Sequence, residues 1–171
     1  MWRDDTRRCA MHPGGARVPD SQMSRATPQM RDFAKCLIAC ETRGDHSSAT
    51  KAPAAFLVCE KLRPQLATLM SNVGFRALLS RALALASGEV NWLRAVHVKS
   101  DGSLEGLAEL ETQVGLEEMA EGSVVLAAQL LGLLAAFIGD NLTLRLVREA
   151  WPKLSLKELD FGKGDKNEKA K

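Results

Sequence analysis

The chain of 171 residues contains no tyrosine, and aromatic residues make up only 5% of it. Stacking of bases on aromatic side chains is a common way to bind single-stranded nucleic acid, so this scarcity argues against such a partner. The sequence also lacks the spaced motifs of serine hydrolases, zinc proteases, P-loop proteins and dinucleotide-binding enzymes. These absences favour a non-enzymatic protein without a cofactor.

The N-terminal segment also lacks the apolar stretch of a secretory signal, since it reads MWRDDTRRCAMHPGG. We therefore expect a cytoplasmic protein whose cysteines are free thiols. Residues 1–27 hold few aliphatic side chains, so we expect a disordered tail there, with Met23 and Met30 as alternative translation starts. We expect one domain over residues 28–161 and a flexible charged tail over residues 162–171.

The longest apolar segment spans residues 123–151 and reads SVVLAAQLLGLLAAFIGDNLTLRLVREAW. Only Gln129 and Gly132 interrupt it over residues 124–138, which predicts either a buried core helix or a membrane segment. A membrane span needs about 20 apolar residues. The fifteen positions of 124–138 are too few, so we favour the core helix and keep a membrane segment at 123–139 as the alternative.

Small residues recur at every fourth position of this segment, at Ala128, Gly132 and Ala136. Such a stripe lets the backbone of a second helix approach closely, in a membrane or in a soluble protein. We therefore identify these residues as a candidate helix-contact stripe. The contact is either with another part of the chain or with a second molecule.

A first helix is predicted to begin at Thr27 and Pro28, because threonine is a good N-cap and proline is tolerated at the first helical position. It should run to about Thr42. A second helical segment should begin at Pro53, and its apolar stripe continues through Pro64. A proline inside a helix removes a hydrogen bond, which predicts either one kinked helix or two short helices that meet near Arg63.

A further break is predicted at Gly74, followed by an amphipathic helix over residues 75–86. The alternation of apolar and polar residues and a turn sequence predict a small hairpin within residues 94–106. The leucine spacing of residues 104–114 is typical of a helix face. The central helix should kink after Gly139, with a cap at the following Asp or Asn.

Two pairs of potential zinc ligands are present, Cys9 with His12 and Cys36 with Cys40. The first pair lies in the expected tail, and the cysteines at 36, 40 and 59 have apolar neighbours. Cysteine is among the most frequently buried residues. We therefore favour buried structural thiols and keep zinc as the alternative.

Charge is divided into two blocks: residues 60–99 carry six basic and two acidic side chains, and residues 100–121 carry seven acidic and no basic ones. His97 is the histidine that we expect to be ordered, on a short strand, and we expect a surface residue rather than a catalytic base. The basic residues that phosphate contacts would favour are Arg63, Arg76, Arg81, Arg94 and Lys99. We expect solvated faces or internal pairing for both blocks, rather than nucleic-acid or calcium binding.

Four phrases of the chain are CEKLRPQLATLM, GFRALLSRALALAS, FIGDNLTLRLVREAWPKLS and DFGKGDKNEK. They resemble phrases of a group of small soil-bacterial hypothetical proteins, over residues 28–171. The resemblance implies a bacterial source and implies no activity.

The sequence therefore predicts a mainly α-helical protein. We expect a compact bundle of five or six helices around a central apolar helix, with one small β-hairpin. The predicted function is a cytoplasmic, non-enzymatic module that acts through protein contacts, including self-association. Membrane association through residues 123–139 is the alternative.

Overall fold

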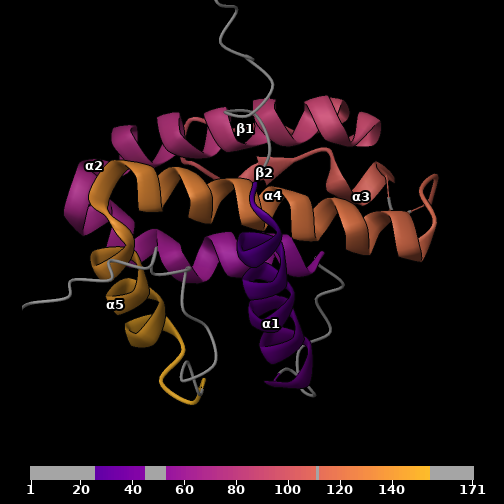
Figure 1. The fold of residues 1–171 in the computed structure, drawn as a ribbon. Helices are drawn as coiled ribbons and strands as arrows, with labels where there is room; N and C mark the ends of the chain where they lie inside the picture. The colour runs from indigo at the N-terminus through magenta and orange to yellow at the C-terminus, as the bar shows by residue number, and fades with distance from the viewer. Residues whose placement is uncertain (1–25, 45–52, 111, 155–171) are drawn as a thin grey trace, which may run out of the picture.

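The computed structural model describes residues 26–44, 53–110 and 112–154, and its described part is mainly helical (Figure 1). The elements, in chain order, are α1 Pro28–Gly44, α2 Ala54–Glu89, a 3-10 helix Asn91–Ala95, β1 His97–Val98, β2 Leu104–Glu105, α3 Leu107–Leu110, α4 Leu116–Ile138 and α5 Asp140–Ala150. The mainly α fold with one small sheet is confirmed. The predicted tails lie outside the described residues, apart from residues 26 and 27.

Helix α1 begins as predicted. The backbone N–H of Met30 donates a hydrogen bond of 3.2 Å to Oγ1 of Thr27, so this threonine caps the helix and Pro28 takes the first helical position. The helix ends at Gly44, two residues beyond the predicted Thr42. Phe33 and Leu37 are fully buried, as their helical spacing implied.

Of the two alternatives predicted at Pro64, the structure has the single helix, and the break predicted at Gly74 lies at Ser71 instead. The helix continues through Pro64, because Leu62 and Leu66 on either side are fully buried and hold both turns against the core. The non-helical residue is Ser71, with φ 66° and ψ 166°, a conformation that favours glycine. The chain reverses there, and Figure 1 shows the two halves of α2 on opposite sides of α4.

The predicted hairpin forms between β1 and β2, which pair antiparallel with His97 opposite Glu105 and Val98 opposite Leu104. The helix expected over residues 104–114 is much shorter. Among the residues of this range that the structure describes, only α3, at Leu107–Leu110, is helical, and Leu104 belongs to the sheet.

Helix α4 begins at Leu116 with Glu117 and Glu118 in its first turn, where the helix dipole favours acidic residues. The predicted break after it is confirmed: Gly139 has φ 86° and separates α4 from α5. Gly139 itself precedes α5, so the predicted cap at the next Asp or Asn is wrong. Thr143 Oγ1 donates a hydrogen bond of 2.9 Å to the Gly139 carbonyl oxygen and secures this corner.

Helix α4 lies at the centre of the core and packs against α1, α2 and α5 (Figure 1). Gln129, the polar interruption of the apolar run, is 4% exposed. Its Nε2 donates a hydrogen bond of 2.6 Å to Glu89 of α2, and that carboxylate also pairs with Arg31 of α1. A buried polar group needs such a partner, and this one ties three helices together.

Candidate functional site

The most apolar cavity described lies between α2, from the turn before Ser71 to Arg81, and the C-terminal half of α4. It is a groove of about 540 Å³. Its lining consists of two helical faces, one from each helix: Met70, Gly74, Ala77, Leu78 and Arg81 from α2, and Leu133, Ala136 and Phe137 from α4. One charged residue, Arg81, is part of this lining. A groove of this chemistry suits the apolar face of another protein segment.

Large apolar side chains project into solvent at this groove. Phe137 is 75% exposed and lines the groove itself. Val73, which is 69% exposed, lies one helical turn before Ala77. Exposed apolar side chains that gather beside a groove are typical of an interaction surface.

The reversal at Ser71 makes the groove, because it turns the second half of α2 back along α4. The Ser71 Oγ accepts a hydrogen bond of 3.4 Å from the backbone N–H of Gly74, so this serine acts as the cap of the returning helix. The break predicted from the sequence at Gly74 lies three residues too far along the chain. The serine itself, three residues before that glycine, was the available signal.

The predicted helix-contact stripe is divided between core and surface. Ala128 is fully buried, Gly132 is half-buried, and Ala136 is exposed and lines the groove. The space beside Gly132 is open, since a Cβ there would have no neighbour within 4 Å. The structure therefore brings one stripe residue, Ala136, to the candidate site.

A second cavity, of about 560 Å³, lies where α1 and α5 end. Glu41 accepts a hydrogen bond from the Trp151 indole and forms an ion pair of 2.6 Å with Lys61. The Lys61 ammonium also lies 5.0 Å from the centroid of the Trp151 ring. An aromatic ring and a carboxylate together attract a cation. In this structure Lys61 of the chain itself occupies the position between the ring and the carboxylate.

The prediction of buried thiols is correct for Cys59 and wrong for Cys36 and Cys40. Cys36 is exposed, Cys40 is half-buried and Cys59 is buried. Burial, with a smaller contribution from Glu60, raises the pKa of the Cys59 thiol to about 12, and Arg63 opposes this shift. Within the described residues no cluster of three or more potential metal ligands is present.

The other pair of potential zinc ligands, Cys9 and His12, lies outside the described residues, as does His46. His97 is exposed on β1, as predicted for a surface residue on a short strand. None of the described cysteines or histidines lines the apolar groove.

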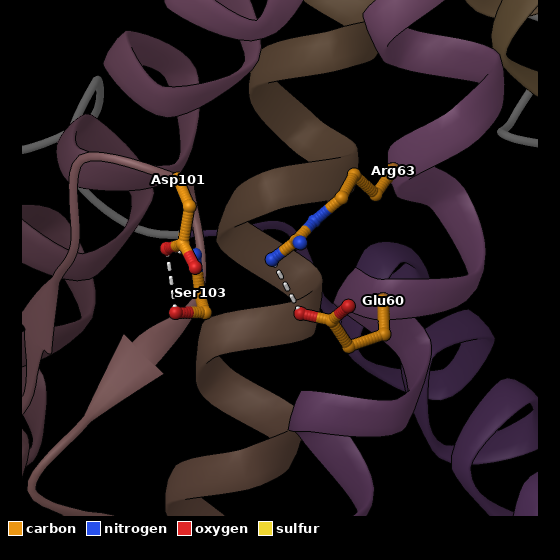
Figure 2. A network of polar contacts seen from close by, with 4 residues as sticks. All are labelled: Glu60, Arg63, Asp101 and Ser103. Atoms are coloured by element: carbon orange, nitrogen blue, oxygen red, sulfur yellow. Dashed lines mark hydrogen bonds and ion pairs between the residues drawn. The ribbon is translucent and has the colours of Figure 1, made fainter.

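Figure 2 shows two separate polar pairs, Arg63 with Glu60 on α2 and Asp101 with Ser103 in the hairpin loop. The Arg63 Nη2 donates a hydrogen bond of 2.6 Å to Glu60, and its guanidinium lies 5.9 Å from the centroid of the Phe75 ring. In the loop, the Ser103 hydroxyl and backbone N–H both donate to the Asp101 carboxylate. The Ser103 hydrogen bonds, and more weakly the charges of Arg63 and Lys99, lower the pKa of Asp101.

The basic residues considered for phosphate contacts have different surroundings. Lys99 forms an ion pair of 3.6 Å with Glu105, and Arg94 donates to the Ser87 carbonyl oxygen. Arg76 and Arg81 are exposed on α2. Of these, only Arg81 borders the apolar groove.

Comparisons with protein-family models, curated proteins and solved structures give no match. The resemblance to soil-bacterial proteins therefore stays a prediction.

Proposed function

We propose that this protein is a non-enzymatic module that associates with a second copy of itself through the groove between α2 and α4. The exposure of Phe137 beside an apolar groove supports this proposal most directly. Burial of a large apolar side chain contributes roughly 1.5–3 kcal/mol. Association would remove this side chain and the groove from water together.

A second copy suits this surface because the groove and the projecting Phe137 belong to one face. In a two-fold dimer the same patch of both subunits meets, so the patch must contain both a projection and a hollow that accepts it. The groove covers only a few helical turns. We therefore expect a weak, concentration-dependent dimer.

The test is sedimentation velocity of the full chain over a range of concentrations. Phe137→Asp should shift the equilibrium towards the monomer, since a carboxylate would be buried without a partner at the contact. Leu116→Asp is the matched control, because Leu116 lies at the other end of α4 and is 91% exposed. A wild-type chain that stays monomeric at all concentrations would contradict the proposal.

Membrane association is the second candidate. Helix α4 has 23 residues and is long and apolar enough to span a membrane by length and composition alone, which corrects the expectation that the apolar segment is too short. However, 56% of its most apolar window is buried inside the structure. Insertion would have to separate Gln129 from Glu89, at the cost of an unpaired buried polar group. We therefore rank it second. Flotation of the chain with lipid vesicles, resistant to alkaline extraction, would favour it over self-association.

We propose that the helices form one compact bundle of five or six around α4, in a bacterial cytoplasmic protein. The burial of Leu126, Leu130 and Leu134 on α4 supports a core at this helix. The buried thiol of Cys59 agrees with a reducing compartment.

A further inference from the structure

The two ends of the groove differ in chemistry. The second half of α2 starts beside the end of α4, so the two helices run in opposite directions along the groove (Figure 1). Gly74 and Phe137 therefore lie at one end, and Arg81 lies about 10 Å further along α2, at about 1.5 Å per residue. Asp140 begins α5 directly beyond the Phe137 end.

Arg81 and Asp140 are both exposed. Neither forms an ion pair with another residue in the part of the chain that the structure describes. One end of the groove is thus lined by an aromatic ring, with a carboxylate three residues further along the chain, and the other end is lined by a guanidinium. A guanidinium attracts both an aromatic face and a carboxylate.

Two face-to-face arrangements with two-fold symmetry are possible for this groove. With the axis along the groove, like ends meet, and Arg81 would face the partner's Arg81. With the axis across the groove, opposite ends meet, and Arg81 would face the partner's Phe137 and Asp140. Charge complementarity selects the second arrangement, because it replaces a like-charge contact by two attractive ones.

We propose that two copies pair about a two-fold axis across the groove, so that Phe137 of each enters the Arg81 end of the other and Asp140 faces the partner's Arg81. This proposal rests on the self-association proposed above and specifies its orientation. Each dimer then contains two symmetry-related contacts between Arg81 and Asp140. A substitution at either residue therefore alters both contacts of the dimer.

This duplication allows a sharp test with two charge-reversal variants, Arg81→Glu and Asp140→Arg. Each variant alone places like charges at both contacts, so its self-association should be about tenfold weaker than that of the wild type. In a mixture of the two variants, the mixed dimer has an opposite-charge pair at both contacts. The mixture should therefore form a mixed dimer with near wild-type affinity.

The measurement is sedimentation velocity of each variant and of the equimolar mixture, with one variant carrying a fluorescent label. Arg76→Glu is the matched control, because Arg76 is exposed on the same helix and does not line the groove. It should leave dimerisation unchanged. Circular dichroism melting of each variant checks that the fold is retained.

The outcomes separate this inference from the proposed function. A preferred mixed dimer supports the crossed orientation. A second result is that the wild type dimerises and Phe137→Asp weakens the dimer, while the mixture of the two charge-reversal variants associates no more tightly than either variant alone. That result overturns the orientation and leaves self-association standing. A wild type that is monomeric throughout overturns self-association as well.

Discussion

The indole ring of Trp92 lies directly against Gly122 of α4. A Cβ at Gly122 would lie 2.7 Å from Cε2 of the ring and overlap its neighbouring atoms. The indole N–H donates a hydrogen bond of 3.2 Å to the Glu118 carbonyl oxygen, which holds the ring in this position. The glycine is thus required by packing, inside a helix where glycine is otherwise unfavourable.

This contact predicts opposite effects for two alanine substitutions in the same helix. Gly122→Ala should lower the free energy of unfolding by about 1–3 kcal/mol, because the methyl group forces the ring out of place. Gly132→Ala should raise it by about 0.5–1 kcal/mol, because a Cβ there meets no atom within 4 Å and alanine favours the helix. Urea denaturation measures both values. Equal effects of the two substitutions would contradict the packing at Trp92.

Leu134 of α4 is 1% exposed, so the core should not tolerate a charge at this position. Leu134→Asp should lower the free energy of unfolding by at least about 3 kcal/mol, through a lost apolar contact and a buried carboxylate. Since domains of this size are stable by about 5–15 kcal/mol, melting should shift strongly or disappear. Leu116→Asp, at an exposed position, is the control. An unchanged melting temperature of Leu134→Asp would show that α4 is not core.

The thiols of Cys36 and Cys59 should react at very different rates. The thiolate is the reactive form, and burial raises the pKa of Cys59 to about 12, so this thiol stays protonated at pH 8. Cys36 is exposed and should be labelled by iodoacetamide within minutes. Peptide mass spectrometry after brief labelling checks this. Cys59 should react only when denaturant is added, and rapid labelling of the native protein would refute its burial.

The hairpin turn should respond to acid through Asp101. Its pKa is lowered in the folded protein by the Ser103 hydroxyl and backbone N–H, so the contribution of the carboxylate to stability is present above the pKa of the unfolded chain. That contribution is lost as the pH falls through the lowered folded pKa. Ser103→Ala should raise the pKa of Asp101 towards its ordinary value of about 3.9, as measured by carboxyl NMR titration.

Ser100→Ala is the control for this titration, because Ser100 lies in the same turn and the bonds to Asp101 come from Ser103. It should leave the pKa of Asp101 low. An Asp101 pKa that does not change in Ser103→Ala would mean that the hydrogen bond from the Ser103 hydroxyl does not lower it.

Several local features could be predicted from the sequence because neighbouring residues decide them. Thr27 and Pro28 start a helix through a cap and a fixed φ, and Gly139 ends one because glycine adopts positive φ without strain. The ion pair between Arg145 and Glu149, with N and O atoms 3.4 Å apart, follows from their spacing of one helical turn. The apolar run before Gly139 likewise predicted a core helix from its composition.

Other features depend on residues that are distant in the sequence. The break of α2 falls at Ser71 rather than at Pro64, because burial of Leu62 and Leu66 outweighs the local penalty of proline. Gln129 could be recognised as polar, but its partner Glu89 lies forty residues away. No local pattern specifies such a pair.

The sequence by itself determined where α1 and α2 begin, where α4 ends and that residues 123–138 belong to an apolar helix, because propensity, capping and periodicity act over a few residues. Only the tertiary structure decided which face of that helix is covered. The reversal at Ser71 lays the returning half of α2 along α4, whose Ala128 is buried while Ala136 and Phe137 stay at the surface. The groove exists because two segments distant in the chain meet, and their meeting depends on the packing of the whole core.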